Sequence, residues 1–164
     1  MSDARAMAGW QDVMDVESDF AADVQRVFDA HAHKTIATLR RDGSPRLSGI
    51  ELGFMAGEVT FGMMPRSRKA ADLRRDPRAE IHSASFIVEG DEGSWIGDAR
   101  ISGRAREVTD PDERARYTDT PPAAHPVFVM EIERVVRIAL EGSPPHLIVR
   151  TWRPGRPIER AVAD

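Results

Sequence analysis

The chain of 164 residues contains no cysteine, and this absence excludes several classes of protein at once. Without thiols there is no disulfide framework, no thiolate nucleophile and no cysteine-ligated metal site. No apolar run approaches the roughly 18 residues that a membrane-spanning helix needs, so no membrane partner is predicted. The first residues carry Asp3, Asp12, Asp15 and Glu17 without an apolar core segment, unlike a signal peptide. We therefore expect a cytoplasmic protein.

The chain also lacks an excess of positive charge, since 23 Lys and Arg residues face 27 Asp and Glu residues. A formal net charge of −4 does not favour general nucleic-acid binding, and no nucleic-acid partner is predicted. The alternative is a local basic patch between Arg66 and Arg78, for which salt-sensitive DNA binding would be the sign. The composition, 41% hydrophobic and 30% charged, is typical of a globular protein.

Two segments follow from the hydrophobic pattern. Residues 1–17 show no steady period and are predicted to be a mobile N-terminal arm, or a segment that orders against a partner subunit. Residues 18–164 are predicted to form one domain, as suits their length. This domain begins with a helix over residues 18–31, whose core-facing stripe consists of Phe20, Val24, Val27 and Phe28.

After this helix the period becomes that of β-strands. Strands are predicted over residues 34–39, 46–54, 59–63, 78–83, 95–108, 127–140 and 146–152, with a further short helix over residues 110–117. Successive hairpins that lead into a helix favour an antiparallel sheet over a doubly wound parallel one. Gly49, Gly53 and Gly62 are costly in strands unless a bulge or a close-lying ligand requires them, which suggests that a flat ligand lies against this sheet.

The most informative stretch runs from residue 63 to residue 78. Ser67 is a good N-cap for a short helix, and Asp76-Pro77 ends that helix because proline keeps the preceding residue out of the α region. Free N–H groups and the macrodipole favour acidic residues at a helix start, but this start carries Arg66, Arg68 and Lys69. Such a start is suited to an anion, usually phosphate. The alternative is that the three cations are solvated surface charges.

The order Ser67-Arg68-Lys69-Ala70, followed by Leu73 and by Asp76-Pro77-Arg78 and a new strand, resembles the flavin-phosphate segment of the pyridoxamine 5′-phosphate oxidase family. The neighbouring hairpin and the C-terminal strands resemble that family too, so the likeness covers about residues 24–155. The resemblance implies a mainly β fold, the six-stranded antiparallel split β-barrel of the FMN-binding type with a few helices. It also implies a homodimer with its sites at the subunit interface.

For the cofactor, the resemblance implies that Arg68 and Lys69 hold the FMN phosphate with help from Ser67, while the ring lies along the second and third strands. The implied cofactor-binding set is Arg46, Ser48, Gly49, Ile50, Met63, Met64, Ser67, Arg68 and Lys69. The family's lysine at the far end of the second strand is absent, with Glu51 or Leu52 near that place. Pyridoxamine phosphate oxidation is therefore not predicted, and neither a catalytic residue nor a metal site is assigned.

These expectations define an FMN-dependent oxidoreductase that acts on an unidentified small molecule, with the flavin carrying the hydride. One alternative on the same fold is a reductase that uses the deazaflavin coenzyme F(420), whose long acidic tail would give Arg66, Arg74 and Arg75 a use. The match of Ser67-Arg68-Lys69 to the FMN pattern favours FMN. The other alternative is a non-catalytic flavin- or haem-binding protein. The isolated His125 is expected to have a structural role.

Overall fold

The structure, a computed structural model, describes residues 7–85, 94–121 and 123–163. It is mainly β, and every strand pair is antiparallel, as predicted. The described residues form nine strands in one sheet rather than six. The elements are α1 (Trp10–Val16), α2 (Ser18–Asp29), β1 (Lys34–Leu39), β2 (Pro45–Ile50), β3 (Leu52–Met55), β4 (Glu58–Gly62), α3 (Arg68–Arg75), β5 (Arg78–His82), β6 (Asp98–Glu107), α4 (Pro111–Arg114), β7 (Val127–Glu141), β8 (His146–Arg153) and β9 (Arg156–Ala163).

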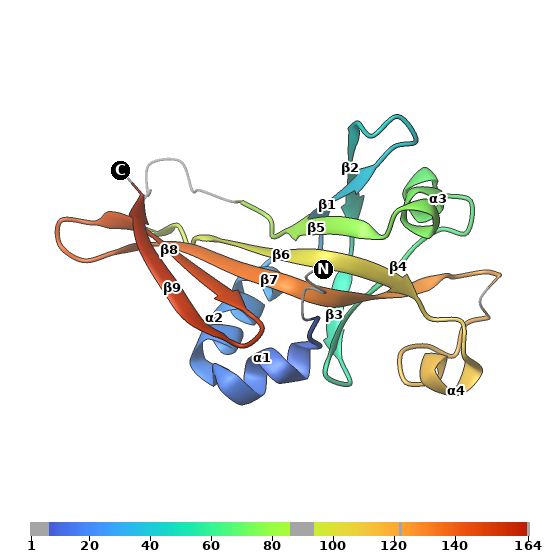
Figure 1. The fold of residues 1–164 in the computed structure, drawn as a ribbon, viewed down its shortest axis with the longest axis horizontal. Helices are drawn as coiled ribbons and strands as arrows, with labels where there is room; N and C mark the ends of the chain where they lie inside the picture. Colours follow the sequence, from blue (N-terminus) through green and yellow to red (C-terminus); the bar gives the residue numbers. More distant parts are fainter. Residues whose placement is uncertain (1–6, 86–93, 122, 164) are drawn as a thin grey trace, which may run out of the picture.

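The long strand β7 organises the sheet (Figure 1). Along one edge it pairs with β6 over residues 128–138. Its other edge is shared, because β4 pairs with residues 127–129 and β8 pairs with residues 135–141. The sheet therefore divides on that edge into two parts, β4–β3 and β8–β9, which diverge in Figure 1.

The strand predicted over residues 46–54 is interrupted at Glu51. Before this residue β2 pairs with β1, and after it β3 pairs with β4. The chain thus changes its partner strand within one residue, and a strand that serves two parts of the sheet cannot be recognised from alternation alone. The change places the end of β2 next to β3 and β4, where the predicted cofactor site lies.

The prediction of a mobile arm over residues 1–17 is wrong for the part that the structure describes. Residues 10–16 form α1, in which Trp10 and Val13 are 1% and 0% exposed. The Trp10 ring lies 4.6 Å from the ring of Phe54, between centroids, and Ala8 bridges to Ile132 of β7. A helix of two turns has too few positions to establish a period. Residues 1–6 lie outside the described residues.

The predicted core stripe of the next helix is confirmed. Phe20, Val24, Val27 and Phe28 of α2 are all buried, which stabilises the fold by about 1.5–3 kcal/mol for each large side chain. A long-range ion pair fixes the same helix to the sheet, with Arg137 Nε of β7 2.8 Å from Asp23 Oδ2. Within the described ranges, no helix is long and apolar enough to cross a membrane.

The final strand, β9, was not predicted. Gly155, with a φ of +69°, turns the chain after β8, and β9 returns along that strand. Most residues of β9 are exposed, so the strand lacks the alternation by which half-buried strands are recognised.

Candidate functional site

A groove of about 780 Å³ lies over the end of β2 and over β3 and β4; we call it the β2–β4 groove. Most of its lining residues are apolar or glycine, as suits a flat ring, but Thr60 of β4 and the acidic Glu51 also line it. Lys69 of α3 closes one margin. The connection between α4 and β7 supplies Tyr117, Thr118 and His125.

The nine residues of the implied cofactor-binding set fall into three places. Gly49, Ile50, Met63, Met64 and Lys69 line the β2–β4 groove. Ser67 and Arg68 stand beside it, at the cap and the first position of α3. Arg46 and Ser48 belong to β2 but do not line the groove. Five of the nine residues thus line one groove, and the other four lie outside its lining.

The helix α3 begins with the N-cap Ser67, and its first turn contains no acidic residue. The Ser67 hydroxyl accepts a hydrogen bond from the backbone N–H of Ala70 at 3.3 Å, so the predicted cap is confirmed. Arg68 is exposed, and the Lys69 ammonium donates to the backbone carbonyl of Gly49. Partial burial lowers the pKa of Lys69, because a buried ammonium loses hydration. The helix dipole and both cations therefore present positive potential at the groove.

One residue at this helix had no predicted role. Asp72 is 4% exposed, and its Oδ2 accepts from Arg46 Nε at 2.6 Å and from the Thr38 hydroxyl at 3.1 Å. Its Oδ1 accepts from Arg75 Nη2 at 3.0 Å. Burial by itself would raise the pKa of Asp72, but the hydrogen bonds from Arg46, Arg75 and Thr38 outweigh it and hold that pKa below its usual value. The carboxylate is therefore ionised at neutral pH.

The two arginines in the last turn of α3 are held by other contacts. Arg74 makes a bidentate pair with Glu107 of β6, at 2.6 and 2.7 Å. Arg75 bonds to Asp72 and also donates to the backbone carbonyl of Leu39. Both guanidinium groups are therefore tied to the protein, whereas Arg66 and Arg68 make no side-chain hydrogen bond or ion pair among the described residues.

His125 lies at the groove rather than apart from it. The buried Arg114 donates to the backbone carbonyls of Thr120 and His125 and so holds this connection in place. The imidazole rests on β4, because a Cβ at Gly62 would lie 1.9 Å from His125 Nε2. A contact across 63 residues leaves no local signal in the sequence, so its position over the groove was missed.

The three strand glycines therefore have different surroundings. The imidazole of His125 accounts for Gly62, and a Cβ at Gly53 would make only ordinary contact with Met55, at 3.5 Å. A Cβ at Gly49 would meet nothing within 4 Å. Of the three, Gly49 is the position where open space leaves room for a flat ligand against the sheet.

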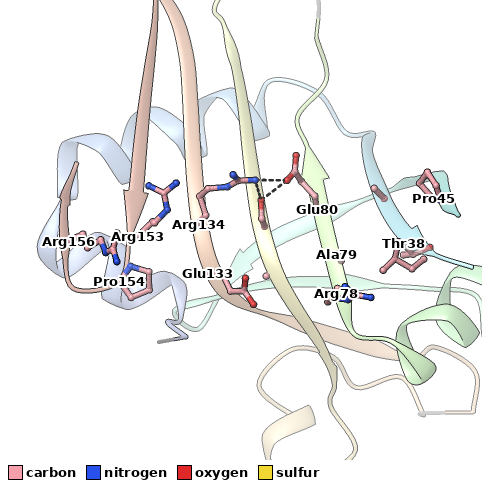
Figure 2. Close-up of a pocket in the computed structure, with 14 residues that line it drawn as sticks. Thr38, Pro45, Arg78, Ala79, Glu80, Glu133, Arg134, Arg153, Pro154 and Arg156 are labelled. Carbon is pink, nitrogen blue, oxygen red and sulfur yellow. Dashed lines mark hydrogen bonds and ion pairs between the residues drawn. The ribbon is translucent and has the colours of Figure 1, made fainter. Parts of the chain in front are cut away.

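A second groove, of about 820 Å³, lies between β1, β5, β6 and β7 and the turn between β8 and β9; we call it the outer groove (Figure 2). Three of the four arginines on its lining, all except Arg156, pair with carboxylates among the described residues. Arg134 lies 3.1 Å from Glu80, a contact drawn as a dashed line in Figure 2. Arg153 lies 3.0 Å from Glu159. Arg78 lies 2.7 Å from Asp76. These pairs reduce the attraction of the outer groove for an anion.

Comparison with known proteins places this chain in a family. The model of the pyridoxamine 5′-phosphate oxidase family matches residues 20–138, and the chain belongs to that family. This stretch includes the start of α3 and all nine residues of the implied set. A search of curated protein sequences gave no match.

Solved structures with the same fold include proteins of several kinds. An FMN-binding, pyridoxamine 5′-phosphate oxidase-related protein from Nostoc punctiforme is 14% identical, with a TM-score of 0.62 over 90% of this chain and 96% of that one. PhzG from Burkholderia lata, in complex with tetrahydrophenazine-1-carboxylic acid, is 16% identical, with a TM-score of 0.60 over 93% and 91%. A haem-binding protein from Mycobacterium smegmatis is 22% identical, with a TM-score of 0.54 over 86% and 57%. At these identities the likeness establishes the fold alone.

Proposed function

We propose that this protein binds FMN in the β2–β4 groove and acts as a flavin-dependent oxidoreductase on a small molecule. The observation that carries the proposal is the start of α3, where a capped helix N-terminus without acidic residues meets Arg68 and Lys69 beside an apolar groove. Such a terminus binds phosphate through backbone N–H groups and cations together.

The groove suits the remainder of the cofactor as well. Gly49 leaves open space above β2, while Met63 and Met64 supply apolar surface where the chain leaves β4 for α3. When bound, FMN supplies hydride and electron transfer. The protein's own part is to hold the phosphate, to orient the ring against the sheet and to exclude water from its apolar side. No side chain is needed as a covalent nucleophile.

The contacts of Arg74 and Arg75 favour FMN over the deazaflavin coenzyme. The long acidic tail of the deazaflavin would need cations beyond the phosphate site. Arg74 is committed to Glu107, and Arg75 to Asp72 and Leu39, so Arg66 alone of the three suggested residues has no such contact among the described residues. We accordingly expect a preference for FMN.

A homodimer belongs to the same proposal. Leu47 of β2 and Met64, which lines the groove, are 72% and 79% exposed. Large apolar side chains at the margin of a binding site are typical of a surface that a partner covers. A second copy seated there would enclose the groove. Sedimentation of the protein, and of a Leu47→Glu variant expected to dissociate it, tests this part separately.

The first experiment is an absorbance spectrum of the purified protein, followed by titration with FMN and with the deazaflavin coenzyme. We expect tight FMN binding with flavin bands and weaker binding of the deazaflavin. Preference for the deazaflavin would replace FMN in the proposal, and binding of neither would overturn it. Turnover with a reduced nicotinamide or a reduced deazaflavin then separates an enzyme from a flavin carrier.

Haem binding is the second candidate, because two imidazoles, those of His33 and His125, line the same groove. Imidazole is a usual axial ligand of haem iron. A haem titration that gives a Soret shift in the parent protein and none in a His125→Ala variant would favour this candidate. Undiminished FMN binding in that variant would separate the two ligands.

A further inference from the structure

The buried carboxylate of Asp72 connects the helix of the proposed phosphate site with the strand that carries Arg46. It is the meeting point of three elements, since Thr38 comes from β1, Arg46 from β2 and Arg75 from α3 itself. A buried acidic group of this kind persists only where its hydrogen bonds and ion pairs offset the loss of hydration. The unusual feature is its place in an otherwise cationic helix.

The geometry brings Arg46 to one face of that helix. Lys69 and Asp72 are three positions apart in α3, and Arg68 and Asp72 are four apart, so all three side chains project on neighbouring turns of the same side. The bond between Lys69 and the Gly49 carbonyl keeps this side against β2. Asp72 therefore holds the Arg46 guanidinium under the face that carries Arg68 and Lys69.

The particular atom that Arg46 uses also matters. The bond to Asp72 is made through Nε at 2.6 Å, and among the described residues the terminal nitrogens, which carry four of the five N–H donors, make no hydrogen bond. Arg46 is partly exposed, with 19% of its side chain accessible. The two positive charges of Arg46 and Arg75 exceed the single negative charge of Asp72, so the region keeps a net positive charge.

We propose that Asp72 is a positioning residue for anion binding: it fixes Arg46 beside Arg68 and Lys69, so that three cations from two elements form one site for the flavin phosphate. This inference rests on the proposed function. It gives a role to Arg46, which belongs to the implied cofactor-binding set but does not line the groove. Asp72 itself does not touch the ligand.

The rival explanation is that Asp72 only fastens α3 to the sheet. Riboflavin has the ring of FMN without its phosphate, so it does not depend on a phosphate site. The two explanations therefore differ in whether an Asp72 variant loses affinity for FMN alone or for both ligands. If Asp72 acts through the phosphate site, the Asp72→Asn substitution lowers affinity for FMN by about tenfold and leaves riboflavin affinity within about twofold. A purely structural role lowers both affinities together.

The experiment is a parallel fluorescence titration of FMN and riboflavin with the parent protein, Asp72→Asn and Asp76→Asn. Asp76→Asn is a matched control, because it makes the same change at the end of the same helix, where the carboxylate bonds to Arg78 rather than to Arg46. We expect it to keep the parent's preference for FMN. Equal losses for both ligands in Asp72→Asn, or an unchanged FMN affinity, would overturn the inference.

Two further observations keep the outcomes distinct. If the parent shows no preference for FMN over riboflavin, the proposed phosphate site itself fails, whatever Asp72 does. If Asp72→Asn does not fold, Arg46→Lys replaces it, since this variant keeps the positive charge but loses the guanidinium that Asp72 orients. We expect Arg46→Lys to lose FMN affinity selectively, and an unchanged preference for FMN would count against a fixed Arg46.

Discussion

The two grooves of this protein are nearly equal in size, about 780 and 820 Å³, but they differ in how their charges are balanced. In the outer groove, Arg78, Arg134 and Arg153 each pair with a carboxylate. At the β2–β4 groove, Lys69 donates to a backbone carbonyl, and the adjacent helix start contains no acid. Two grooves of similar volume therefore differ in the charges that an anion would meet beside them.

The largest effect is expected when the cations at the start of α3 are removed, which tests the difference in charge between the two grooves. The double variant Arg68→Ala/Lys69→Ala should weaken FMN binding by about 3 kcal/mol, roughly a hundredfold, because two charge-assisted contacts are lost. Folding should be almost unaffected, since neither side chain is fully buried. Isothermal titration gives the affinity, and thermal unfolding checks the fold.

The matched control removes two cations from the other groove. Arg134→Ala/Arg153→Ala makes the same change in charge within the outer groove, where both guanidiniums are already paired. We expect it to leave FMN affinity unchanged. If this control loses as much affinity as the first variant, the distinction between the grooves is wrong.

The next largest effect is on stability and concerns the ion pair between Arg78, which lines the outer groove, and Asp76. The Arg78 guanidinium beside Asp76 lowers the pKa of that carboxyl to about 2. Because the folded pKa lies below that of the unfolded chain, the stabilisation is complete above about pH 4 and is lost as the pH falls towards 2. Because Arg78 is exposed, solvent screens the pair and keeps this contribution small.

Urea unfolding at pH 6, 4 and 2.5 measures this contribution. The parent should be slightly more stable than Asp76→Asn at pH 6, and the difference in the free energy of unfolding should shrink at pH 2.5. A difference that stays constant over this range would show that the ion pair is not its source.

The smallest effect is expected for a substitution on the surface of the β2–β4 groove. In the free protein a methyl group at position 49 meets no atom within 4 Å, so Gly49→Ala should not destabilise the fold. If the flavin ring lies against this strand, the same methyl group should reduce FMN affinity by about 1 kcal/mol, roughly fivefold. Unchanged affinity, measured by the same titration, would place the ring elsewhere in the groove.

Features that depend on neighbouring residues could be predicted from the sequence, and features that depend on distant residues could not. Local signals located α3 and its Ser67 cap, the core stripe of α2 and most strands, because each depends on residues within one turn or one hairpin. The implied cofactor-binding set came from a resemblance, and five of its nine residues line one groove. No local signal indicated that Arg46 would meet Asp72, which is 26 residues further along the chain.

The sequence by itself determined the class of fold, the cationic start of α3 and the family to which the chain belongs, because these depend on the local order of residues. Only the tertiary structure decided that the chain changes strands at Glu51, that Trp10 is buried and that His125 rests on Gly62. It also decided which arginines are paired with carboxylates. Such contacts join segments that are far apart in the chain, and burial and charge compensation depend on where the folded chain brings them together.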